Sequence, residues 1–149
     1  MLETSQHAAL ARELDEAERT RVQVEQFSRR HPAMTIADSY AIQREWVRLQ
    51  SDAGRRVIGH KIGLTSRAMQ LASQITEPDF GTLLDSMLLR DGSEVEAARF
   101  IVPRFELEFV FTHAPVARTA PVQVEVFAPF VGVVPTAAQL HIPAPQVHG

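Results

Sequence analysis

The sequence predicts an α+β fold, in which N-terminal helices are followed by a β-sheet. Residues 5–28 and 35–53 carry apolar side chains at the spacing of amphipathic helices. Residues 56–64 and 100–111 are expected to be strands, and the second of them alternates apolar with polar side chains, as a strand with one buried face does. With 149 residues, the chain is long enough to bury a sizeable core as one domain.

Capping residues predict where the helices begin and end. Ser5 is the expected N-cap of the first helix. Thr35, with Asp38 three positions later, resembles a capping box at the start of the second, and Gly54 is expected to end that helix. A short third helix is expected after Thr65 or Ser66, either of which can cap it.

Lys61 lies between two glycines on one face of the predicted strand 56–64. It is the only lysine among 15 basic residues. Lysine can lose its proton when desolvated, whereas arginine effectively cannot, and Gly59 and Gly63 leave room on this face. Lys61 is therefore a candidate proton donor to an oxyanion, and the alternative is a solvated strand lysine. His60 is expected on the opposite face as a core residue.

Residues 77–81 predict a loop, because proline, aspartate and glycine favour turns. Asp79 within it is either a general acid or base, or an ordinary turn aspartate. Residues 87–89 predict a short strand, and residues 91–92 a turn.

Glu106 and Glu108 leave the same face of the predicted strand 100–111, with their bases about 7 Å apart. Two carboxylates at this separation can share one cation, and their oxygens suit Mg²⁺ or Mn²⁺. The alternative is the solvated acidic face of an amphipathic strand.

Composition excludes several classes of function. The chain has no cysteine, which excludes a disulfide scaffold, a cysteine-based zinc site and a thiol nucleophile. A net charge of -3 provides no basic surface for nucleic acid. No apolar run approaches the length of a membrane span, and no signal peptide is recognisable. We therefore expect a cytoplasmic protein without nucleic-acid or membrane partners.

The composition changes sharply near residue 112. Residues 113–149 hold only two of the 33 charged residues, Arg118 and Glu125, but six of the nine prolines. Dense prolines prevent a long helix and restrict strands to short or edge pieces. We divide the chain into residues 1–111, the N-terminal part of a catalytic domain, and a divergent Pro-, Val- and Ala-rich tail, residues 112–149, interpreted as a frameshifted or scrambled ending.

Several separated motifs resemble the N-terminal part of the hydratase/decarboxylase branch of the fumarylacetoacetate hydrolase superfamily. They agree with it in order and spacing over about residues 5–111, and they include QREWV at 43–47, GHKIGLTS at 59–66, EPD at 77–79, GTLLD at 81–85, FIVPR at 100–104 and ELE at 106–108. The resemblance implies a mixed, rolled β-sheet, here incomplete. It also implies a homo-oligomeric lyase acting on a small 2-oxo-enoate dicarboxylate.

The same resemblance assigns roles to residues. It implies a divalent cation, Mg²⁺ or Mn²⁺, held by Glu106, Glu108 and a third glutamate, yet residues 133–139 hold no carboxylate where that third ligand is expected. Lys61 and Asp79 are the expected catalytic residues. The candidate substrate-binding residues are Leu64, Arg67 and Arg104. Which of the two arginines meets a second carboxylate stays open, and so does the alternative of a non-catalytic remnant or interaction module.

Overall fold

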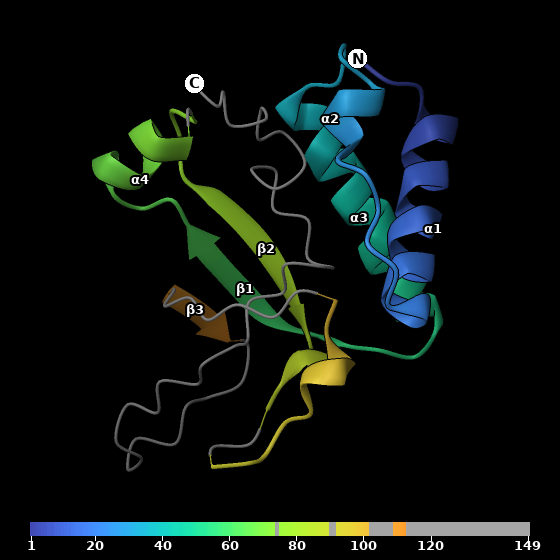
Figure 1. Ribbon diagram of the computed structural model, residues 1–149, viewed down its shortest axis with the longest axis vertical. Helices are drawn as coiled ribbons and strands as arrows, with labels where there is room; N and C mark the ends of the chain where they lie inside the picture. Colours follow the sequence, from blue (N-terminus) through green and yellow to red (C-terminus); the bar gives the residue numbers. More distant parts are fainter. Residues whose placement is uncertain (74, 90–91, 102–108, 113–149) are drawn as a thin grey trace.

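The computed structural model describes residues 1–73, 75–89, 92–101 and 109–112, the last four as backbone. Three helices precede the first strand, and one short helix lies between the first two strands, which confirms the predicted α+β class (Figure 1). Over the described ranges, no helix is long and apolar enough to cross a bilayer. The elements are α1 (Thr4–Thr20), α2 (Phe27–Arg30), α3 (Ile36–Asp52), β1 (Val57–Gly63), α4 (Arg67–Ser73), β2 (Asp79–Leu84), the 3₁₀ turns η1 (Asp85–Met87) and η2 (Ala97–Arg99), and β3 (Phe109–Thr112).

The first helix is shorter than the predicted 5–28. Helix α1 ends at Thr20, because Arg21 adopts a left-handed conformation with φ of 61° and turns the chain. The chain then returns as α2, which places Phe27 in the core with only 1% of its surface exposed. Arg30 of α2 donates to both carboxylate oxygens of Glu13 in α1, at 2.7 and 2.8 Å. Burial of an aromatic ring thus overrides the continuous helical pattern.

Both ends of α3 match the sequence prediction. The Thr35 hydroxyl accepts a hydrogen bond from the Asp38 amide at 3.2 Å, and the Asp38 carboxylate accepts one from the Thr35 amide at 2.9 Å. Gly54 follows the C-cap with φ of 89°, a left-handed conformation that favours glycine.

The described strands form one antiparallel sheet in the order β2-β1-β3, so β1 is central. Gly59, Lys61 and Gly63 are buried, while the residues between them are half-buried, in agreement with the predicted division of this strand into two faces. Figure 1 shows α1, α2 and α3 gathered on one side, β2 as the strand nearest to them, and α4 at the end where β1 stops and β2 begins.

Two predicted elements between β1 and β3 are wrong. Residues 79–81 are not a loop but the first half of β2, paired with β1 from Gly63 to Lys61. Ladder hydrogen bonds outweigh the turn preference of the local residues. Residues 87–89 are not a strand, because the chain leaves the sheet in a 3₁₀ turn whose Asp85 bonds back to the Arg56 amide at 3.1 Å.

The described residues cover only the two ends of the predicted strand 100–111. Residues 100–101 follow the η2 turn and are not paired, whereas β3 confirms a strand from Phe109. Residues 102–108 and 113–149 lie outside the described residues, and so do the predictions made for them.

Leu84 is the buried side chain of the sheet that packs into the main hydrophobic core, and Val57 of β1 packs against the same core. Leu84, at the end of β2, is fully buried and packs in a cluster whose other buried members come from the N-terminal helices and their connections. Those members are Leu10, Ala11, Leu14, Phe27, Met34, Ile42 and Trp46. The hydrophobic contact between the helices and the sheet thus lies at the end of β2 opposite its first residue, Asp79.

Replacing Leu84 by alanine is expected to lower the free energy of unfolding by about 3 kcal/mol, because it leaves a cavity between the two layers. Urea denaturation followed by the fluorescence of Trp46, the single tryptophan, measures the change. Leu88→Ala is the matched control, since Leu88 is 50% exposed and its truncation should change stability by less than about 0.5 kcal/mol. Equal losses in the two variants would contradict the role given to Leu84.

Candidate active site

Lys61 occupies the middle of the central strand. Its backbone lies opposite Gly81 of β2 and Val110 of β3, and the residue is only 7% exposed. The alternative of a solvated strand lysine is therefore wrong. Burying an ammonium group is costly, and such groups are concentrated at functional sites.

Asp79 lies on the same face as Lys61. It begins β2 directly opposite Gly63 and is 5% exposed, so it is not an ordinary turn aspartate. Residues that face each other across two strands point to the same side of the sheet, as do residues two apart along one strand. Lys61 and Asp79 are therefore diagonal neighbours, with side-chain bases about 7 Å apart.

Two glycines complete this arrangement. Lys61 faces Gly81 across the β1–β2 ladder, and Asp79 faces Gly63, so the charged residues occupy opposite corners of a four-residue rectangle. Because glycine has no side chain, the space above the rectangle is left to the ammonium and the carboxylate. An ammonium donor and a carboxylate acceptor that converge on one space can stabilise a developing oxyanion and move a proton.

Leu64 redirects the chain as it leaves β1. It is 9% exposed and has φ of 53°, a left-handed conformation that costs a leucine about 1–3 kcal/mol. Its carbonyl accepts a hydrogen bond from Gln70 Nε2 at 2.9 Å, and its side chain packs on Ile75. Such strained residues occur often at active sites. The Ser66 hydroxyl accepts from the Met69 amide at 3.2 Å, so Ser66 caps α4.

The remaining candidate residues are less completely described. Arg67 begins α4 and is exposed, at the end of the sheet where Asp79 begins β2. Arg104, Glu106 and Glu108 lie outside the described residues. In the described part of the chain, no three or more His, Asp or Glu residues are grouped as metal ligands would be.

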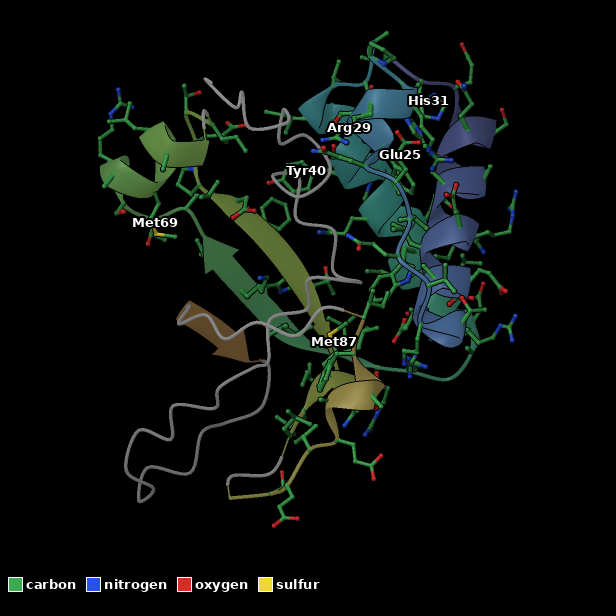
Figure 2. The ribbon with its side chains drawn as sticks, in the orientation of Figure 1. Glu25, Arg29, His31, Tyr40, Met69 and Met87 are labelled. Atoms are coloured by element: carbon green, nitrogen blue, oxygen red, sulfur yellow. The ribbon has the colours of Figure 1, made fainter. Side chains whose placement is uncertain are left out.

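Two residues of α3 that the sequence analysis did not select reach the start of β2. Figure 2 shows Tyr40 between α3 and β2, where its ring stacks on Phe80 with centroids 4.5 Å apart. Gln43 Nε2 donates to the Phe80 carbonyl at 3.3 Å. Tyr40 and Gln43 are three residues apart on one helix face, and Gln43 opens one of the family motifs. This spacing, together with the family motif, is the sequence feature that indicates a shared contact for the two residues.

The pKa of the Tyr40 phenol is raised above its ordinary value. Burial is the main cause, and the negative charges of Asp79 and Glu77 add to it, while a hydrogen bond with the Phe80 backbone acts in the opposite direction. The phenol therefore lies within electrostatic reach of the candidate acid/base Asp79.

The chain is similar to several known proteins. A scan against protein-family models finds no match. The chain is 53% identical over 114 residues to 2-oxo-hept-4-ene-1,7-dioate hydratase of Escherichia coli, covering 76% of this chain and 43% of that protein. It is 47% identical over 83 residues to 2-hydroxyhexa-2,4-dienoate hydratase of Comamonas testosteroni, covering 54% and 31%.

A solved structure shares the fold. It is 4-oxalocrotonate decarboxylase from Pseudomonas putida G7, complexed with magnesium and adipate, with a TM-score of 0.69 and 32% identity over 71% of this chain and 40% of that one. The chain belongs to the hydratase/decarboxylase branch of the fumarylacetoacetate hydrolase superfamily, which confirms the resemblance and the fold class. It spans less than half the length of these relatives.

Proposed function

We propose that this protein is a magnesium-dependent hydratase, a hydro-lyase that adds water to 2-oxohept-4-ene-1,7-dioate in homoprotocatechuate (4-hydroxyphenylacetate) degradation. The observation that carries the proposal is the burial of Lys61 and Asp79 on one sheet face, each opposite a glycine. The identity to the hydratase of Escherichia coli supports the choice of substrate.

Lys61 is proposed to stabilise the negative charge that builds on the 2-oxygen of the substrate. The 4,5 double bond must first move into conjugation with the ketone before water can add at C4, and both steps place charge on that oxygen. A buried ammonium aimed at an oxyanion is worth more than one in water, because the site has a low dielectric constant.

Asp79 is proposed as the group that moves protons along the carbon chain. As a carboxylate it can take a proton from C3, and as an acid it can return one to C5, which shifts the double bond. Its place diagonal to Lys61 lets one substrate meet both groups at adjacent atoms.

Glu106 and Glu108 are proposed to hold the metal. In the predicted strand they share a face with Val110, and Val110 pairs with Lys61 across the β1–β3 ladder, which supports placing both carboxylates toward the same site. When bound, a divalent cation supplies positive charge that polarises the 2-oxo group. The related 4-oxalocrotonate decarboxylase from Pseudomonas putida G7, solved with magnesium and with calcium, supports a divalent metal.

The second carboxylate of the substrate is proposed to meet Arg67 or Arg104, and Leu64 to line the space between α4 and the sheet. Arg67 fits this role because it begins α4 beside the end of the sheet that carries Asp79. A guanidinium can bind a carboxylate through two parallel hydrogen bonds. We further propose a cytoplasmic homo-oligomer, as is usual in the family.

Two sister activities use the same groups, 2-oxopent-4-enoate hydration and 4-oxalocrotonate decarboxylation, and relatives of both kinds match the chain. Incubation with each of the three substrates, followed by identification of the products, distinguishes them. Faster turnover of 2-oxopent-4-enoate than of the 1,7-dioate would reject a site built for a dicarboxylate.

A second candidate function is a non-catalytic remnant or an interaction module. It is favoured by the loss of charge after residue 112 and by the absence of a carboxylate in residues 133–139. With two metal ligands instead of three, metal binding would be weak and hydratase activity impaired. Sequencing the locus tests the origin of the tail: a family sequence in another reading frame supports a frameshift, and an independent ending rejects it.

Millimolar Mg²⁺ is expected to raise the melting temperature, because a ligand that binds the folded state stabilises that state. At a Mg²⁺ concentration of 100 times its Kd, the free energy of unfolding rises by about 2.7 kcal/mol. Differential scanning calorimetry at constant ionic strength measures the shift. The matched control is Glu106→Gln with Glu108→Gln, in which the shift should disappear. If Mg²⁺ has no effect on the parent chain, the non-catalytic alternative is favoured.

A further inference from the structure

Helix α3 holds the backbone and the side chain of one β2 residue, Phe80. Tyr40 stacks on the Phe80 ring with centroids 4.5 Å apart and an interplanar angle of 16°. Gln43 Nε2 donates to the Phe80 carbonyl at 3.3 Å. The helix therefore contacts Phe80 through its ring and through its main chain.

Burial of the Phe80 ring does not explain these contacts, because Phe80 remains 46% exposed. Gln43, in contrast, is only 3% exposed, and a buried amide is costly unless its hydrogen bonds are made. The buried amide is thus directed at the strand backbone beside Asp79. Side chains alternate along a strand, so Phe80 points toward α3 while Asp79 points to the face of Lys61.

We propose that Tyr40 and Gln43 are positioning residues. They hold the backbone at the start of β2, so that Asp79 keeps its place diagonal to Lys61. Once the main chain of Phe80 is held by α3, the direction in which the Asp79 side chain leaves the strand is also set. The catalytic consequence rests on the proposed function, but the positioning can be tested without any turnover.

The composition of the chain provides a probe of this arrangement. Tyr40 is the only tyrosine, so the absorbance of tyrosinate at about 295 nm reports the titration of this one phenol. Because the charge of Asp79 raises the pKa of Tyr40, the midpoint of that titration senses the place of Asp79.

The experiment is a double-mutant cycle on the full chain. Asp79→Asn is expected to lower the titration midpoint of Tyr40, since it removes a negative charge close to the phenol. In the Gln43→Met background the same substitution should lower the midpoint by less, because the start of β2 is no longer held. Trp46 fluorescence at each pH verifies that the variants remain folded.

Gln50→Met is the matched control. Gln50 lies on the same helix and is 2% exposed, but its amide donates to Asp15 of α1 at 2.5 Å instead of to β2. Both substitutions remove a buried amide from α3, so the coupling to Asp79→Asn is what distinguishes them. In the Gln50→Met background, the effect of Asp79→Asn should equal that in the parent.

Two results would overturn the proposal: a Tyr40 midpoint that does not respond to Asp79→Asn in the parent, or a response as large with Gln43→Met as with Gln50→Met. If Gln43→Met does not fold, Gln43→Leu replaces it and likewise removes the amide that donates to the Phe80 carbonyl. Amide hydrogen exchange at Phe80 and Gly81 should then become about tenfold faster, as expected for the loss of one hydrogen bond. Unchanged exchange would contradict the proposal equally.

Measurement of kcat and KM adds a second test, because a residue with a purely structural role would not change kcat selectively. With 2-oxohept-4-ene-1,7-dioate and Mg²⁺, Gln43→Met should lower kcat with little change in KM, whereas Gln50→Met should alter neither. If the parent has no turnover, the proposed function fails while the titration cycle still decides the positioning.

Discussion

Exchange of Asp79 for asparagine is expected to lower the rate of hydration of 2-oxohept-4-ene-1,7-dioate by about 10²–10⁴-fold. The substitution preserves the size of the side chain but removes its ability to carry a proton. Because residue 79 is 5% exposed, bulk water has little access to replace it. Loss of substrate absorbance with Mg²⁺ present measures the rate.

Asp85→Asn serves as the control for this prediction. Asp85 lies just beyond the other end of β2, where its carboxylate bonds to the Arg56 side chain at 3.2 Å, and it is far along the strand from Lys61. Its exchange should leave the rate within about twofold of the parent. A parent rate unaffected by Asp79→Asn would remove Asp79 from the mechanism. A parent without turnover would favour the non-catalytic alternative.

Replacing Asp38 by alanine is expected to lower the free energy of unfolding by about 3–5 kcal/mol. Asp38 is 1% exposed, and its carboxylate accepts hydrogen bonds from the Leu2 amide at 3.0 Å and from the Thr35 amide and hydroxyl at 2.9 and 2.8 Å. It also lies 2.8 Å from His7 Nε2. Removing it leaves these half-buried donors without the Asp38 carboxylate as their acceptor.

Asp52→Ala is the matched control for Asp38→Ala, and urea denaturation measures both. Asp52 lies on the same helix, but its ion pair with Arg48 is exposed, with 64% of the Asp52 side chain accessible. Exposed pairs contribute little, so a loss within about 0.5 kcal/mol is expected. If Asp38→Ala were as mild as this control, the hydrogen-bond network would not be what holds the N-terminus to α3.

The same carboxylate makes stability depend on pH. Burial alone would raise the pKa of Asp38, but hydrogen bonds from Thr35, His7 and Leu2 lower it well below its ordinary range. A lowered folded-state pKa gives stability that is present above the unfolded pKa of about 3.9 and is lost as pH falls below it. The stability difference between the parent and Asp38→Asn should therefore shrink from about pH 5 downward.

Local patterns were predicted well where neighbouring residues decide the structure. The Thr35–Asp38 capping box, the Gly54 end of α3 and the strand 57–63 all follow from contacts within a few residues. Predictions failed where distant contacts win. The chain turns after α1 so that Phe27 can enter the core, and residues 79–81 join a ladder with β1 despite their turn residues.

The sequence by itself selected the candidate residues: the single lysine between glycines and the EPD and ELE motifs predict roles for Lys61, Asp79, Glu106 and Glu108. It also determined the caps of α3, because capping depends on residues three or four positions apart. The predicted N-cap of the first helix, Ser5, is wrong: α1 begins at Thr4 after Glu3, whose side chain and that of Gln6 form a capping box. Only the tertiary structure decided that Asp79 lies in a strand, diagonal to Lys61 and beside a Phe80 held by α3. The register between two strands depends on non-local hydrogen bonds and packing, which no local pattern encodes.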